Sequence, residues 1–287
     1  MPEILDSLSL PGSPARPNED SCGAAGRFAW VIDGYVLAGH PPLMDAPSDA
    51  AWLAAFASAR FAARAPQAQD ARDLIAAVIE EARATFLARI EERGATARRD
   101  PATWPAAALT LAEFGPGRLV TYTLADTIAY VRDAEGAVYT LGEAPALRIE
   151  ERALAERLMR ETGTGCDAVR ETDAFKTEMA ARRRALVEGA PAAFGLHRDA
   201  AALAERGEVA LSGEGHVLLA SDGFSAYVEL YERTDAEGLI AQALDEGLAE
   251  IGARLRAVEE VEDPQGRLHP RFKRSDDATA ILLRATF

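Results

Sequence analysis

Short apolar runs alternate along this chain with longer stretches of helical period, and this alternation most constrains the fold. Residues 28–32 (FAWVI) and 216–220 (HVLLA) are apolar at nearly every position, which is typical of short strands buried on both faces. Residues 70–93 carry apolar side chains three or four positions apart, which predicts an amphipathic helix. A sheet with two apolar faces needs helices to cover it, so the pattern predicts an α+β domain.

The same two periods predict the other elements. Helices are expected at residues 49–65, 70–93, 151–161, 176–187 and 235–259, and strands at residues 28–32, 107–114, 119–124, 127–132, 138–141, 216–220 and 278–284. Gly115-Pro116-Gly117 predicts a hairpin turn. Residues 189–215 show no clear period. The sequence has neither an internal repeat nor a linker, so residues 1–287 are expected to form a single domain.

The charge of the chain argues against several classes of partner. Forty-six acidic and 31 basic side chains give a formal net charge of −15, which disfavours nucleic acid and anionic membranes. Cys22 and Cys166 are too few for a disulfide framework and are expected to be free thiols. Residues 1–15 lack the basic and apolar pattern of a signal peptide, and no apolar run is long enough to span a bilayer. We therefore expect a cytoplasmic protein.

Acidic residues recur where expected strands begin or end. Asp33, Asp126 and Asp222 each follow an apolar run, and Asp277 precedes the last one. A single Asp-Gly after a strand is usually only a turn, so the repetition carries the argument. Carboxylates that meet at one rim of a sheet repel each other unless a cation lies among them, and Mg²⁺ and Mn²⁺ prefer carboxylate and water ligands. The pattern therefore favours a site for divalent cations.

Five short words of the sequence resemble the motifs of the PP2C-type, metal-dependent protein phosphatases (the PPM family). They are RPNED (residues 16–20), VIDG (31–34), ADT (125–127), LASDGF (219–224) and SDDAT (275–279). They span nearly the whole chain in the order of the family. The resemblance implies a four-layer α-β-β-α sandwich, in which two antiparallel sheets lie between pairs of helices, and a variable flap-like region at about residues 144–215.

The resemblance also implies a site. Asp33, Asp222 and Asp277 would bind two Mn²⁺ or Mg²⁺ ions, together with the backbone carbonyl of Gly34. The remaining acids implied by the motifs are Glu19 and Asp20, which would hold metal-bound water, and Asp126, a candidate ligand of a third, weaker metal. A water or hydroxide bridging the two ions would attack the phosphorus of phosphoserine or phosphothreonine.

The chain departs from the family pattern in the residues that grip phosphate and donate a proton. The phosphate-binding Arg of the family is displaced by one position, since Ala15 is followed by Arg16. Tyr35 stands where some members have His, and His40 is the nearby candidate for the proton donor. Ala125 replaces the glycine of the third motif. In addition, the loop at residues 263–274 is expected to form a basic rim for a phosphoprotein.

The sequence thus predicts a protein serine/threonine phosphatase that requires Mn²⁺ or Mg²⁺ and acts on a phosphorylated protein. Its alternative is a phosphatase-like module that binds a phosphoprotein with little or no turnover, because the residues around the metal motifs are altered.

Overall fold

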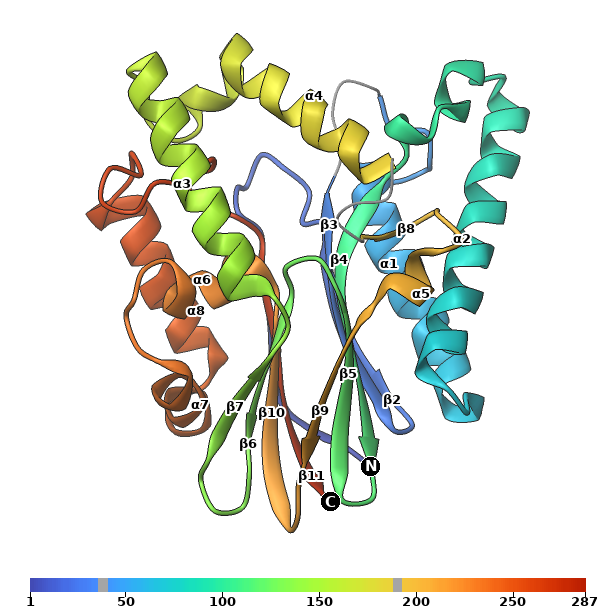
Figure 1. Cartoon of the computed structure of the whole chain (residues 1–287), viewed down its shortest axis with the longest axis vertical. Coiled ribbons are helices and arrows are strands. Elements are labelled where there is room, and N and C mark those ends of the chain that lie inside the picture. The colour runs from blue at the N-terminus through green and yellow to red at the C-terminus, as the bar shows by residue number, and fades with distance from the viewer. Residues whose placement is uncertain (36–40, 188–192) are drawn as a thin grey trace.

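Two antiparallel sheets lie face to face at the centre of the computed structural model, which describes residues 1–35, 41–187 and 193–287 (Figure 1). The first sheet has the order β1-β11-β10-β6-β7: Glu3–Leu10, Ala278–Thr286, Glu214–Ala220, Ile128–Arg132 and Val138–Leu141. The second has the order β2-β3-β4-β5-β9: Asp20–Ala25, Phe28–Tyr35, Ala106–Gly115, Arg118–Leu124 and Glu205–Ala210. The short β8, Phe194–Gly195, pairs with β4.

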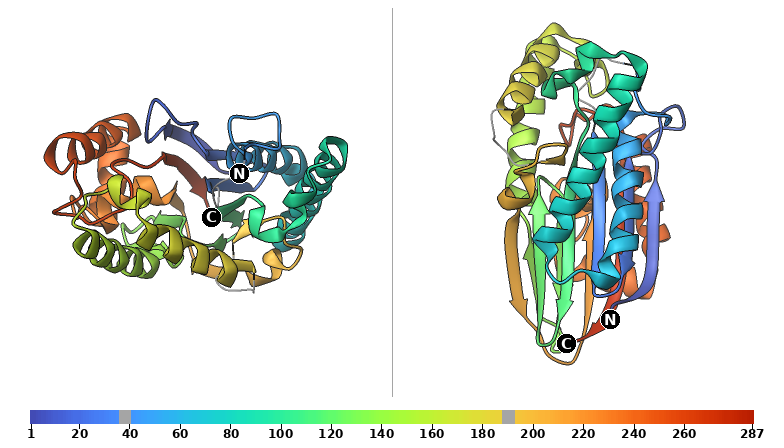
Figure 2. Two further views of the ribbon diagram at one scale, coloured as in Figure 1. Left: turned by 90° about the horizontal axis from the view of Figure 1, so that it is seen from above. Right: turned by 90° about the vertical axis from the view of Figure 1, so that its right-hand side faces the viewer.

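Helices cover the outer faces of both sheets and one end of the sandwich (Figures 1 and 2). The second sheet is covered by α1, Asp49–Arg64, and α2, Ala71–Arg93. The first is covered by α6, Asp222–Glu229, α7, Ala236–Asp245, and α8, Leu248–Ala257. Two further helices, α3, Ala144–Thr162, and α4, Asp173–Val187, lie across the end opposite the two termini (Figure 1).

Short helical turns complete the structure. They are α5, Ala200–Leu203, the 3-10 turns Ala65–Gln67, Thr96–Arg99, Pro101–Thr103 and Ala168–Glu171, and the π turn Val258–Glu262. No described helix has the length and apolar character needed to cross a membrane.

The strand β3 shows why the runs are apolar at every position. Phe28, Trp30 and Ile32 pack against α1 and α2, whereas Ala29 and Val31 pack against the other sheet. All five side chains are essentially inaccessible to solvent. The expected four-layer arrangement with two antiparallel sheets is therefore confirmed.

Three local predictions were wrong. The helix expected over residues 235–259 is two helices, because Gly247 adopts a left-handed conformation (φ 88°) between α7 and α8. The helix expected from residue 151 begins at Ala144, with a proline in its first turn. The first two strands, β1 and β2, were not expected, and Asp20 lies at the start of β2.

Candidate metal and phosphate site

Both sheets bring acidic residues to the end that α3 and α4 cover. Asp20 and Asp33 face each other across the β2–β3 pair in the second sheet. Asp222 follows β10 and opens α6, and Asp276 and Asp277 come directly before β11, both in the first sheet. Residues more than 180 positions apart in the chain thus meet at one rim, as the sequence predicts for Asp33 and Asp222.

Ser221 fixes Asp20 across the two sheets. Its hydroxyl donates to Asp20 Oδ2 at 2.8 Å and accepts the backbone N–H of Thr279 at 2.9 Å. Asp20 Oδ1, in contrast, is buried and has no hydrogen-bond partner within the described ranges. A buried carboxylate oxygen without a partner is costly, so this atom is a candidate for binding a cation or its water.

The shared rim raises the pKa of several carboxyls. Burial, followed by the charges of neighbouring acids, raises the pKa of Asp20 to about 8, although the hydrogen bond from Ser221 opposes the shift. Burial raises the pKa of Asp33 well above its usual range, and the nearby charges of Asp20 and Asp222 raise it further. Without a cation, these carboxyls are therefore kept partly protonated.

Asp222 is the charged member of the group because Arg148 of α3 lies beside it. Burial alone would raise the pKa of Asp222, but the Arg148 guanidinium and the neighbouring Asp33 carboxyl bring the pKa below its usual value. Arg148 Nη2 lies 3.3 Å from Asp222 Oδ2 and 2.7 Å from the Asp222 carbonyl oxygen. Asp222 Oδ1 is buried and, among the described residues, without a partner.

Asp126 lies on the same side of the rim as Arg148. Burial raises its pKa to about 7, and the charges of Asp222 and Glu151 act in the same direction. The preceding residue, Ala125, has a φ of 65°, in the left-handed region that favours glycine. Ala125 therefore adopts a backbone conformation that glycine would adopt with less strain.

Asp276 and Asp277 have different surroundings. Asp277 accepts the backbone N–H groups of Gly12 and Glu19, at 2.7 and 2.8 Å, so each of its oxygens already has a donor. Asp276 is bonded to the Lys273 ammonium, and its charge raises the pKa of Asp20 and Asp33. Sequence reasoning did not name Asp276 as a ligand, although it is the neighbour of Asp277. The assignment of Asp277 remains a prediction, with Asp276 as a second candidate.

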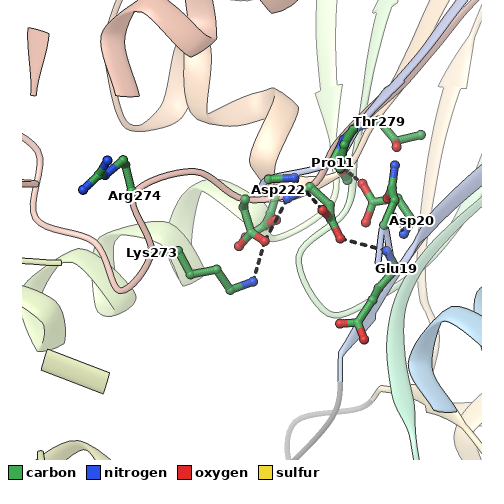
Figure 3. Close-up of polar contacts among 12 residues, drawn as sticks. Pro11, Glu19, Asp20, Asp222, Lys273, Arg274 and Thr279 are labelled. Carbon is green, nitrogen blue, oxygen red and sulfur yellow. Dashed lines mark hydrogen bonds and ion pairs between the residues drawn. The ribbon is translucent and has the colours of Figure 1, made fainter. Parts of the chain in front are cut away.

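Glu19 and Gly34 also lie at this rim. The Gly34 N–H donates to the Glu19 carbonyl at 3.0 Å, and a Cβ on Gly34 would come within 2.7 Å of that oxygen, so only glycine fits. Burial raises the pKa of Glu19, and the Ser48 hydroxyl, which donates to its carboxylate, opposes this shift. Figure 3 shows the Glu19 and Asp20 side chains at this edge of the site.

The expected basic rim is formed only in part. Lys273 points toward the acids and Arg274 points away from them (Figure 3). Arg271 is 6% exposed and is paired with Asp263 at 2.9 Å, so its side chain does not face a partner as predicted. His40 lies outside the described residues.

A guanidinium that the sequence did not indicate adjoins the expected Arg16. Arg170 lies in the turn Ala168–Glu171, and Asp167, directly before this turn, is hydrogen-bonded to the loop that carries Lys273. Burial and the charge of Arg16 both lower the pKa of Arg170, and its buried Nη1 has no partner in the described part of the chain. Arg16 likewise has no carboxylate within 4 Å in that part of the chain. Two close guanidinium groups without carboxylate partners suit a phosphate.

The residues at the rim fit divalent cations in the chemistry of their donors. Carboxylates and a backbone carbonyl are the hard ligands that Mg²⁺ and Mn²⁺ take, and two of the buried carboxylate oxygens have no partner within the described ranges. However, no three His, Cys, Asp or Glu side chains within residues 1–35, 41–187 and 193–287 already surround one point as metal ligands would. Ion binding would therefore require the carboxylates to reorient.

Comparison with known proteins decides the family of the fold. Neither a protein-family model nor a curated protein matches the chain. Solved structures do match. The catalytic domain of the serine/threonine protein phosphatase PstP in complex with two manganese ions matches with a TM-score of 0.52 and 16% identity, over 99% of this chain and 97% of that one. The serine/threonine phosphatase Stp1 from Staphylococcus aureus matches with a TM-score of 0.54 and 14% identity, over 99% of this chain and 96% of that one. The PPM phosphatase MsPP from Mycobacterium smegmatis in complex with cacodylate matches with a TM-score of 0.50 and 19% identity, over 99% of both chains.

The chain has the PPM, or PP2C-type, phosphatase fold. The match covers nearly the full length of both chains. At identities below one-fifth, the likeness establishes the PPM fold alone.

Proposed function

We propose that this chain is a protein serine/threonine phosphatase that hydrolyses phosphoserine or phosphothreonine esters with Mn²⁺ or Mg²⁺. The observation that carries the proposal is the meeting of Asp20, Asp33 and Asp222 from both sheets, with two of their buried oxygens left without a partner among the described residues. The fold supports it, since a structural neighbour is described as a serine/threonine protein phosphatase with two manganese ions.

Several of the acids at the rim would together bind two divalent cations. Asp33, Asp222 and the Gly34 carbonyl would bind them with Asp276 or Asp277, and Asp20 and Glu19 would accept hydrogen bonds from their water. When bound, the cations would polarise the phosphoryl group and lower the pKa of an attacking water. The fixed position of Asp20, through Ser221, would orient that water without a rearrangement of the backbone.

Arg16 and Arg170 would bind the phosphoryl oxygens of the substrate. Their positive charges adjoin the carboxylates, so a phosphate held between them would lie at the edge of the cation site. Arg170 would supply the grip that the displaced Arg16 provides less well alone. Guanidinium groups suit this task because their N–H groups form paired, charge-assisted hydrogen bonds.

The alternative function is a phosphatase-like module that binds a phosphoprotein without turnover. Arg148 and Lys273 favour it, because both place positive charge on carboxylates that would otherwise bind cations. Calorimetry separates the two functions: tight binding of Mn²⁺ and phosphopeptide without phosphate release would support the module.

The direct test is phosphate release from a phosphothreonine peptide and from an aryl phosphate, with Mn²⁺ and with a chelator. We expect release that depends on Mn²⁺ and falls by at least about 100-fold in Asp222→Asn, as for loss of a main electrostatic group. Asp199→Asn is the matched control and should keep full activity, because Asp199 is exposed in a turn whose Arg198 pairs with Glu80 of α2. Equal activity with the chelator, or in Asp222→Asn, would refute the proposal.

A further inference from the structure

The Arg148 guanidinium is held by oxygen atoms on the α3 side of the acidic rim. Nη2 donates to the Asp222 carbonyl at 2.7 Å and lies 3.3 Å from Asp222 Oδ2, and Nη1 donates to Glu151 Oε2 at 3.0 Å. The Arg148 side chain is only 11% exposed. A buried guanidinium with this many contacts is a fixed part of the site.

The two oxygens of the Asp222 carboxylate have different surroundings. Oδ2 faces the guanidinium, whereas Oδ1 has no partner among the described residues. Burial lowers the pKa of Arg148, but the charges of Asp222, Glu151 and Asp126, and of Asp276 after them, raise it above its usual value. The positive charge of Arg148 therefore offsets the negative charge of Asp222, Glu151 and Asp126 on one side of the rim.

The two basic groups Arg148 and Lys273 lie among different acids of the rim. Lys273 is bonded to Asp276, and the charges of Asp222 and Asp33 also act on it. Arg148 instead contacts Asp222 and Glu151. A divalent cation placed beside Arg148 would meet a fixed positive charge in a partly buried site, which is unfavourable.

We propose that Arg148 is a resident cation that takes the place of a divalent ion on the side of Asp126 and Glu151. This side then binds no metal, and the two ions of the proposed function, on which this inference rests, bind on the side of Asp20, Asp33 and Asp222 Oδ1. Asp126, the candidate for a third metal, is neutralised by Arg148 instead.

The test is the number of Mn²⁺ ions bound per chain, measured by calorimetry and by elemental analysis after desalting. Arg148→Met removes the charge and keeps a long side chain, and we expect it to bind one more Mn²⁺ than the wild type. Arg148→Lys keeps a positive charge and should bind the wild-type number. Arg152→Met is the control, because Arg152 lies one turn further along α3, is 40% exposed and pairs with Glu232 at 3.6 Å.

A second variant keeps the inference testable if Arg148→Met fails to fold. Asp126→Asn should leave the number of bound Mn²⁺ ions unchanged, whereas loss of one ion would show that Asp126 binds metal and would overturn the inference. An unchanged number in folded Arg148→Met would overturn it as well. A wild type that binds no Mn²⁺ would refute the proposed function alone, provided that Arg148→Met gains an ion; if neither binds Mn²⁺, both proposals fail.

Discussion

The Ser221 hydroxyl donates to Asp20 Oδ2 at 2.8 Å and so joins the two sheets at the rim where the acids meet. Ser221 follows β10 of the first sheet, and Asp20 opens β2 of the second. The same hydroxyl accepts the N–H of Thr279, so it is fixed from both sides. The position of Asp20 is therefore set by sheet packing, which makes the carboxylate a rigid part of the site even though its charge is unfavourable there.

The metal-free protein should lose stability as the pH rises from about 4 to about 8. In the unfolded chain Asp20 and Asp126 ionise near their ordinary pKa of 3.8, whereas folding raises the pKa values to about 8 and about 7. Between these values the unfolded state releases protons that the folded state keeps, so the free energy of unfolding falls with increasing pH. Urea unfolding in a chelator at pH 5 and pH 8 measures the difference. Asp20→Asn should flatten the dependence, and greater stability at pH 8 would contradict the prediction.

Asp276→Asn should mainly weaken metal binding, whereas Asp277→Asn should mainly lower the stability of the fold. Asp276→Asn should weaken Mn²⁺ binding by about 10-fold or more, because Asp276 carries charge at the rim. Asp277→Asn should change Mn²⁺ affinity little but destabilise the fold by about 1–3 kcal/mol, because one of two backbone N–H groups loses its acceptor. Calorimetry and urea unfolding of both variants measure this. Loss of Mn²⁺ binding in Asp277→Asn alone would instead make Asp277 the ligand.

Arg170→Met should weaken the binding of phosphate. If Arg170 binds the substrate phosphoryl group with Arg16, its loss should lower kcat/KM for a phosphopeptide by about 10-fold, which corresponds to about 1.4 kcal/mol, mainly through KM. The inhibition constant of inorganic phosphate should rise in parallel. Arg160→Met is the control, since Arg160 is 70% exposed on α3 and only loosely paired with Glu156. An unchanged kcat/KM together with an unchanged inhibition constant of phosphate would contradict this role of Arg170.

Ala125→Gly should stabilise the protein by about 0.5–1 kcal/mol. Ala125 has a φ of 65°, a conformation that costs an L-residue about 1–2 kcal/mol and glycine almost nothing. The gain is reduced because glycine is more flexible in the unfolded chain. Urea unfolding checks the change, with Ala129→Gly in β6 as a control that should be destabilised. A destabilised Ala125→Gly would contradict the account of this turn.

The sequence predicted the sheets and the acids at the rim because both depend on local patterns. The apolar period of β3 shows its burial on two faces, and Asp33 and Asp222 directly follow such runs. Arg148 and Arg170 gave no such signal, because an arginine in a charged helix or turn looks the same whether it faces solvent or a carboxylate. The strand β1 was missed since its exposed residues dilute the apolar period, and its pairing with β11 and its contacts with α8 stabilise it. The sequence shows a glycine at position 247 but not its left-handed conformation, which separates α7 from α8.

The two chain ends lie together at the base of the sandwich, remote from the acidic rim (Figure 1). Glu3 pairs with Arg284 there, while Leu10 pairs with Ala278 beside the rim. An affinity tag, a fluorescent protein or a second domain joined at either end would therefore hang away from the mouth of the site, and a bulky phosphoprotein could approach it unobstructed.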